Sequence, residues 1–177
     1  KNYFVLRFDH DFSFVGSIED GKLSEGKTSA TSNHAMAIVG FRTKRGEQVN
    51  IQVASSFISD EQALRNLKEV EGKTFDEVKT GGRKEWNNIL GRIEVEDDNI
   101  DHLRTFYSCL YRSVLFPRSF YEFDEQGNPI HYSPYNGKVL PGYLFTDTGF
   151  WDTFRSLFPL LNLVRSEEHT SELQSQR

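Results

Sequence analysis

A chain of 177 residues with 37% hydrophobic and 27% charged residues has the composition of a globular protein, not of a disordered one. Its net charge of −5, without any Lys/Arg cluster, excludes an obvious nucleic-acid or anionic-membrane surface. No apolar run approaches the ~20 residues of a membrane-spanning helix. A single cysteine, Cys109, excludes an internal disulfide and lies in an apolar pattern that predicts a buried, inert thiol.

The first 56 residues are predicted to be β-structure. Apolar alternation indicates strands at residues 3–8, 12–18, 35–42 and 48–55. A Gly/Ser/Thr-rich segment at 20–33 is predicted to be a loop, and the Gly-containing turn at 44–47 to join the last two strands as a hairpin. These strands are typical of the end of a β-sandwich whose earlier strands lie outside the chain. Because the chain starts in a strand pattern without Met or a signal peptide, we expect a fragment of a longer protein.

Three helices are predicted to follow. Ser59 with Gln62, and Thr74 with Glu77, form capping boxes that start the first and second helices. Asp98 or Asn99 is predicted to cap the third. The pair Gly81-Gly82 is expected to weaken or kink the second helix, and its Trp86 to pack in the core.

Pro117 is predicted to stop the third helix. Two short strands at 120–123 and 130–132, separated by a polar turn, predict a small hairpin standing out from the helices. A last helix is indicated by Phe150, Phe154 and Leu157 on one face, and Pro159 is expected to bend or end it.

The stretch Ser133–Pro159 carries the strongest chemical signal in the chain. Its first half is rich in Pro, Gly and Asn and is predicted to be a loop, and its second half is helical. The types Thr, Asp, Thr and Gly at 146–149 are those that cap helices. A helix start that presents Trp151, Asp152 and Arg155 offers a sugar an aromatic face and charge-assisted hydrogen bonds. The alternative is that Trp151 belongs to the core and Asp152 forms an exposed ion pair with Arg155.

Several sequence motifs, taken together and in their order along the chain, resemble those of one enzyme family. The run from Phe106 to Leu163, with its YR…FP, SPYNG and GFWDTFR segments, resembles glycoside hydrolase family 92, the calcium-dependent exo-acting α-mannosidases. The resemblance extends back through SFISDEQALRNL and FDEVKTGGRKEWNNILGRIEVE. It implies an α+β chain in three parts: the end of an N-terminal β-sandwich at 1–56, linker helices at 57–97, and the first helices of an (α/α)6 barrel at 98–164.

The family resemblance implies hydrolysis of terminal α-linked mannose, with α-1,2 linkages expected, by an inverting mechanism. Inversion needs a carboxylic acid and a carboxylate base roughly 6.5–9.5 Å apart. In the family a glutamate is the acid, an aspartate is the base and Ca²⁺ binds the 2- and 3-hydroxyls of the sugar. These groups follow the WDTFR motif, so no catalytic residue is expected in this chain and most calcium ligands are expected outside it.

The same resemblance assigns substrate-binding residues. Asp152 is expected to bind mannose hydroxyls and Trp151 to shape the pocket. Arg155 and Asp147 are further candidates, each of which could instead brace the loop. The expected partner is a mannose-containing glycan, in a secreted, periplasmic or cell-surface setting. Two alternatives are a non-catalytic carbohydrate-binding module built on exposed aromatic residues and a structural piece of another glycosidase.

The last thirteen residues, 165–177, differ from the rest. This segment is polar and resembles the translation of a common sequencing adapter, so it is expected to be a non-native tail. It offers only Leu173 for burial, too little to offset the entropy lost on ordering the segment. We therefore expect the tail to pack on nothing.

Overall fold

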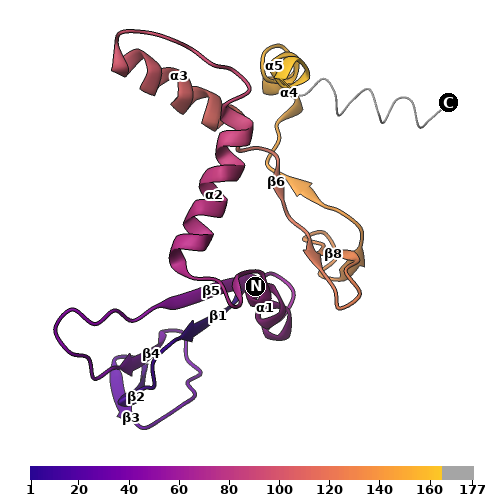
Figure 1. Ribbon diagram of the computed structural model, residues 1–177. Helices are drawn as coiled ribbons and strands as arrows, with labels where there is room; N and C mark the ends of the chain where they lie inside the picture. Colours follow the sequence, from indigo (N-terminus) through magenta and orange to yellow (C-terminus); the bar gives the residue numbers. More distant parts are fainter. Residues whose placement is uncertain (165–177) are drawn as a thin grey trace.

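The computed structural model describes residues 1–164, and its N-terminal part forms two small antiparallel sheets (Figure 1). One sheet pairs the first and last strands of this part, β1 (Tyr3–Phe8) and β5 (Ile51–Ser56). The other has the order β3–β2–β4, with β2 at Phe14–Glu19, β3 at Lys22–Glu25 and β4 at Ala35–Gly40. The pair β2–β4 is therefore nested in sequence inside the pair β1–β5.

The predicted hairpin between strands 35–42 and 48–55 is wrong. Its turn does form, since the Glu47 N–H donates to the Lys44 carbonyl at 3.1 Å. The strands on either side of this turn nevertheless pair in different sheets, β4 with β2 and β5 with β1. Strand partners are decided by which apolar faces meet across the sheets, and a local turn signal does not carry that information.

The predicted loop at 20–33 is also wrong in part, because it contains β3. Asp20 and Gly21 have φ of 48° and 83° and form a two-residue turn, with Glu19 opposite Lys22. Such a turn needs positive φ at both central residues, which Asp-Gly tolerates, and its twist matches that of the flanking strands.

The helices α1 (Asp60–Asn66), α2 (Phe75–Leu90) and α3 (Ile100–Ser113) begin where the capping signals predict, and a 3₁₀ turn at Leu67–Val70 extends the first. The Thr74 N–H donates to Glu77 Oε2 at 2.7 Å and the Glu77 N–H to Thr74 Oγ1 at 3.3 Å, so this capping box is confirmed. Asn99 caps α3 through the Asp101 N–H. The helix α2 runs unbroken through Gly81 and Gly82.

The first capping box forms only by half. Ser59 Oγ accepts the Gln62 N–H at 3.1 Å, but the Gln62 amide turns inward and donates to the Phe123 carbonyl at 2.8 Å. Gln62 is only 2% exposed, so its amide forms a buried hydrogen bond between α1 and the β7–β8 hairpin.

Cys109, predicted to be buried, is exposed on α3, because the apolar face of that helix is centred on Leu110.

The region after α3 is a β-ribbon. Strands β6 (Arg118–Ser119) and β10 (Phe145–Thr146) pair at its base, and a three-stranded sheet lies beyond them, with β7 at Glu122–Phe123, β8 at Pro129–Tyr132 and β9 at Val139–Pro141. The predicted hairpin is confirmed as β7–β8. The strand β9 lies in a segment predicted to be loop, and it pairs with β8 so that Leu140 lies opposite His131.

Glu122 joins this ribbon to the N-terminal part. Its Oε1 accepts the Phe57 N–H at 2.9 Å, and its Oε2 accepts the Asn66 amide at 2.7 Å. Beside it, the rings of Phe57 and Phe120 stack with centroids 4.4 Å apart. Among the described residues, the buried apolar residues are Ala63, Leu67 and Leu110. Ala63 on α1 and Leu67 on its 3₁₀ extension lie in the same region as Glu122.

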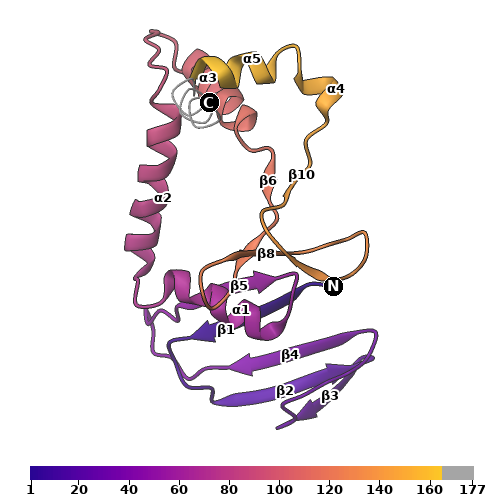
Figure 2. The ribbon, with the colours of Figure 1, turned by 90° about the vertical axis from the view of Figure 1, so that its right-hand side faces the viewer.

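The helix α2 leads away from the N-terminal sheets, and α3 and α5 gather at its far end (Figure 2). Trp86 of α2 contacts Tyr111 of α3, with ring centroids 4.6 Å apart. The last helical stretch is interrupted between α4 (Phe150–Thr153) and α5 (Leu157–Val164), before Pro159. Pro159 is the third residue of α5, in its first turn, so the helix does not end at this proline. Across residues 1–164 we find no helix both long and apolar enough to cross a membrane.

The predicted α+β class is confirmed, whereas the β-sandwich and the (α/α)6 barrel remain predictions, as do the boundaries at 56 and 97. The tail at 165–177 lies outside the described residues.

Candidate substrate-binding site

The four predicted site residues lie on one short segment that joins β10 to α4 and α5. Gly149 is the N-cap of α4, with extended backbone (φ −79°, ψ 106°) and no side-chain cap. Its carbonyl accepts both the N–H and the hydroxyl of Thr153, at 3.3 and 2.8 Å. This single turn sets the directions of Trp151 and Asp152.

Asp152 is the third residue of α4, and its carboxylate folds back over the helix start. A Cβ added to Gly149 would lie 3.2 Å from Asp152 Oδ2, closer than most real contacts. Glycine at this position therefore leaves room for the carboxylate beside the free N–H groups of the first turn, where negative charge is favoured. Asp152 is exposed, so its carboxylate is accessible to a hydroxyl-bearing ligand within the described part of the chain.

The alternative in which Asp152 pairs with Arg155 does not hold in this structure. Among the described residues no ion pair joins the two side chains, and the Arg155 guanidinium instead lies 5.2 Å from the centroid of the Phe154 ring. Burial of Trp151 in a core, the other alternative, is not seen among the described residues. The Trp151 side chain is 82% exposed and contacts the Phe154 ring at a centroid distance of 6.2 Å.

Asp147 has a different role from the other three. It has φ of 64°, the left-handed conformation that Asp tolerates better than most residues. Its Oδ2 accepts the Arg118 Nε–H at 2.6 Å and the Thr146 hydroxyl at 3.3 Å. Because Arg118 pairs with Thr146 across β6–β10, this contact braces the loop at the base of the ribbon. The loop-bracing alternative is therefore what the structure supports for Asp147.

Two residues of this region were missed by the sequence reasoning. Arg118 holds Asp147 from 29 residues away, and no local motif indicates that pairing. Tyr135, in the SPYNG loop, is 93% exposed. Its position between Pro134 and Asn136, two residues typical of turns, was the signal for this exposure, because a ring at the tip of a turn has few neighbours to pack on.

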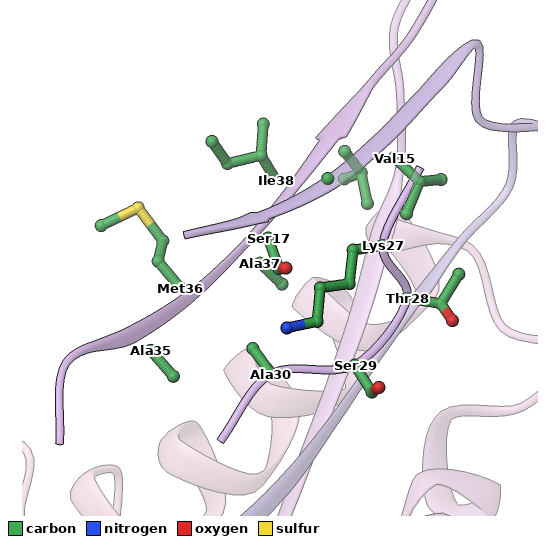
Figure 3. Close-up of a pocket in the computed structure, with 12 residues that line it drawn as sticks. Val15, Ser17, Lys27, Thr28, Ser29, Ala30, Ala35, Met36, Ala37 and Ile38 are labelled. Atoms are coloured by element: carbon green, nitrogen blue, oxygen red, sulfur yellow. The ribbon is translucent and has the colours of Figure 1, made fainter. Parts of the chain in front are cut away.

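These four residues are all exposed in the described part of the chain. A cavity of about 210 Å³ lies elsewhere, between β2, β4 and the segment 27–30 (Figure 3). At this cavity Lys27 Nζ contacts Glu19 Oε2 at 2.5 Å, and the buried Ser17 hydroxyl has no hydrogen-bond partner among the described residues. None of the predicted site residues lines it, so we do not connect it with the sugar site.

Metal binding would need several His, Cys, Asp or Glu side chains close together. Within residues 1–164 no group of three or more His, Cys, Asp or Glu side chains is arranged to hold a metal ion. A calcium ion prefers six to eight oxygen ligands, so the residues of this segment alone do not fit it.

Comparisons with known proteins agree with one another. The profile of the glycosyl hydrolase family 92 catalytic domain matches residues 62–176, a range that also includes most of the tail. A family GH92 inverting mannosidase from Bacteroides thetaiotaomicron VPI-5482 is 46% identical, with a TM-score of 0.82 over 91% of this chain and 22% of that one. A family GH92 α-mannosidase of the same species, solved in complex with mannoimidazole, is 27% identical, with a TM-score of 0.73 over 90% of this chain and 21% of the other.

One curated relative matches a shorter stretch of the chain. It is an uncharacterized secreted glycosidase from Arthroderma benhamiae, 33% identical over 78 residues, which are 41% of this chain and 10% of the relative. The chain thus spans about a fifth of the length of the solved relatives. The family profile covers well over half of the chain and the solved mannosidases share its fold, and from this we conclude that the chain belongs to glycosyl hydrolase family 92.

Proposed function

We propose that the full-length protein containing this chain is an exo-α-mannosidase, which removes terminal α-linked mannose from glycans. The observation that carries the proposal is the 46% identity over 91% of the chain with an inverting mannosidase. The bound mannoimidazole of the second relative supports a mannose-shaped site in this family. The family membership rests on a catalytic domain, which argues against a non-catalytic carbohydrate-binding module.

In this proposal the segment described above supplies part of the sugar subsite. The exposed Trp151 ring offers its face to the C–H groups of a mannose ring, and Asp152 accepts hydrogen bonds from its hydroxyls. The Arg155 guanidinium lies over the Phe154 ring, and its N–H groups are further hydrogen-bond donors for the sugar hydroxyls. Asp147 acts through the loop, because its carboxylate is engaged by Arg118.

The catalytic acid and base, and most ligands of a calcium ion, are assigned to parts of the protein outside this chain. We further propose inversion at the anomeric carbon, a preference for α-1,2 linkages and a secreted, periplasmic or cell-surface location. The inverting relative supports the stereochemistry, and the secreted relative supports the location.

The test uses the full-length protein and α-1,2-mannobiose. We expect mannose to be released with the β configuration in the first NMR spectra, before mutarotation. Activity should be lost in a chelator and restored by added Ca²⁺, with Mg²⁺ as the control ion. Release of α-mannose would contradict inversion, activity in the chelator would contradict the calcium requirement, and failure on every α-mannoside would contradict the function.

A further inference from the structure

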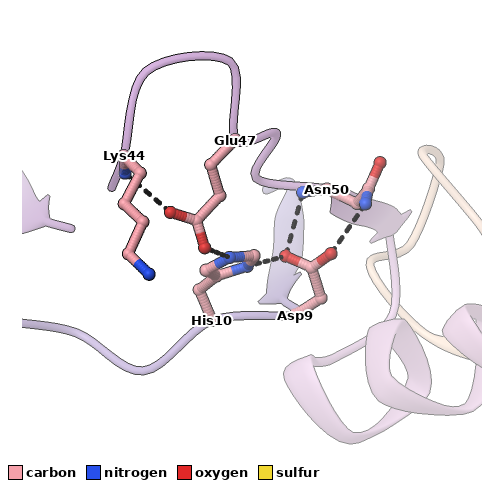
Figure 4. Close-up of polar contacts among 5 residues, drawn as sticks. All are labelled: Asp9, His10, Lys44, Glu47 and Asn50. Carbon is pink, nitrogen blue, oxygen red and sulfur yellow. Dashed lines mark hydrogen bonds and ion pairs between the residues drawn. The ribbon is translucent and has the colours of Figure 1, made fainter. Parts of the chain in front are cut away.

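A polar cluster bridges two connections of the N-terminal part (Figure 4). Asp9 and His10 follow the end of β1 and begin the connection to β2. Glu47 and Asn50 belong to the connection that leads from β4 to β5. Contacts between these two connections therefore tie the β1–β5 sheet to the β2–β4 sheet.

Asp9 anchors one side of this cluster. Its Oδ1 accepts the Asn50 N–H at 2.9 Å, its Oδ2 accepts the Asn50 side-chain amide at 2.7 Å, and its own N–H donates to the Asn50 carbonyl at 3.2 Å. These bonds extend the β1–β5 pairing by one residue pair. They hold the Asp9 carboxylate in place, with Oδ1 only 2.5 Å from His10 Nδ1.

The His10 ring lies between two carboxylates. Its Nδ1 faces Asp9 Oδ1, and its Nε2 lies 3.4 Å from Glu47 Oε1. The other oxygen of Glu47 accepts the Lys44 N–H at 2.7 Å, which fixes the carboxylate in its turn. The charged groups that face or adjoin the ring are thus Asp9, Glu47 and the turn residue Lys44, whose contact with Glu47 is through the backbone (Figure 4).

This geometry satisfies only one protonation state of the ring. A neutral imidazole has one N–H donor and one acceptor nitrogen, whereas the imidazolium has two donors. With carboxylates on both sides, a neutral ring must direct an acceptor nitrogen at a carboxylate oxygen. The charged ring donates in both directions.

We infer that Asp9, His10 and Glu47 form a pH-sensitive latch between the two N-terminal sheets, closed when His10 carries two protons and released when it loses one. Release breaks the contact of His10 with one carboxylate. The connection that carries Glu47 is then held by its own turn, by β5 and by the Asp9–Asn50 bonds, without the contact through the His10 ring. Next to the latch, the rings of Phe8, Phe12 and Phe41 pack together, with centroids 5.2–5.6 Å apart.

The direction of the pH effect follows from the same contacts. The hydrogen bond with Asp9, and then that with Glu47, raise the pKa of His10. A group whose pKa is raised on folding stabilises the fold below its unfolded pKa, and that contribution is lost as the pH rises through its folded pKa. The bonds from His10 and then Asn50 lower the pKa of Asp9 to about 2, so its contribution is present above its ordinary pKa and is lost only in strong acid. The latch is therefore closed in mild acid and opens toward neutral and alkaline pH.

The primary experiment is an NMR titration of the His10 ring in the full-length protein, with backbone amide exchange at Lys44 and Asn50. We expect a His10 pKa above that of a free histidine. Protection factors at the two amides should fall by roughly two- to fivefold between about pH 5 and pH 8, the range that exposed ion pairs produce. The effect should shrink in high salt.

Three variants separate the latch from other causes. His10→Gln should remove the pH dependence of protection, and Glu47→Gln should lower the His10 pKa while the Asp9–Asn50 bonds persist. His34→Gln is the matched control, because His34 is an exposed loop histidine outside this cluster, and it should behave as the wild type. A wild-type His10 pKa at or below that of free histidine would overturn the latch, and so would unchanged pH dependence in a folded His10→Gln variant.

Discussion

At the scale of single residues, the chain contains the same Asp–Arg spacing at two helix starts, with different outcomes. Asp101 and Arg104 at the start of α3 form an ion pair at 2.9 Å. Asp152 and Arg155 at the start of α4 form none among the described residues, because regular helix ends at Thr153 and the guanidinium lies over Phe154. The second carboxylate is thereby left available for a ligand.

Asp152→Ala in the full-length enzyme is expected to lower kcat/KM at least tenfold while the Tm barely moves. A charge-assisted hydrogen bond to a ligand contributes about 1.5–3 kcal/mol, and more if it tightens in the transition state. Asp152→Asn should recover part of the loss, since the amide keeps an acceptor without the charge. Steady-state kinetics and thermal denaturation measure both quantities.

The control for this experiment is Asp101→Ala, which removes an exposed pair of the same spacing. That variant should lose about 0.3–0.5 kcal/mol of stability and keep its kinetics. Wild-type kcat/KM in a folded Asp152→Ala variant would remove Asp152 from the sugar site.

At the scale of elements, α2 is a helix that local signals stabilise more than packing does. It has a complete capping box, yet none of its residues is buried and Phe75 is 74% exposed. Two adjacent glycines in its middle cost helix stability without a visible packing reason, since a Cβ at Gly81 or Gly82 meets no atom within 4 Å.

We expect Gly81→Ala to stabilise the protein by about 0.5–1 kcal/mol, because alanine loses less backbone entropy than glycine in a helix. Gly72→Ala is the matched comparison. It also meets no atom within 4 Å, but its φ of 72° should cost alanine about 1–2 kcal/mol. Denaturant unfolding of the full-length protein measures the two changes, and a loss of stability in Gly81→Ala would show that this segment is not helical there.

At the scale of the whole molecule, much of the apolar surface is open. Large side chains on every part of the described chain are exposed, among them Phe4, Val53, Phe75, Tyr143 and Trp151. Few apolar residues are fully buried in this part of the chain, and the chain spans about a fifth of its solved relatives. The described residues therefore leave most of their large apolar side chains outside a packed core.

We therefore expect the 177-residue chain alone to release no mannose from α-1,2-mannobiose, even with added Ca²⁺. Loss of general acid–base assistance costs about 10²–10⁴-fold in rate, and the open subsite adds to that loss. A sensitive assay of released mannose, with the full-length enzyme as the positive control, measures this. Calcium-dependent turnover by the pure chain would contradict the assignment of the catalytic groups to the rest of the protein.

Features that depend on a few neighbouring residues could be predicted from the residue types alone. The capping box of Thr74 and Glu77 and the cap at Asn99 are contained within a single turn, so their residue types are sufficient to place them. The Asp20-Gly21 turn was equally local, and its signal was overlooked. The family resemblance was also in the sequence, because it rests on the order of the motifs up to GFWDTFR.

Which distant segments meet could be learned only from the folded chain. Tyr3 lies opposite Ser56 and Arg118 binds Asp147, and in each case the partner is chosen by packing across sheets or loops that no local pattern encodes. The same holds for Arg155, whose guanidinium lies over the Phe154 ring instead of on Asp152 because α4 ends after one turn. Local hydrogen bonds are set by residue type, whereas long-range contacts are set by the free energy of the whole packed arrangement.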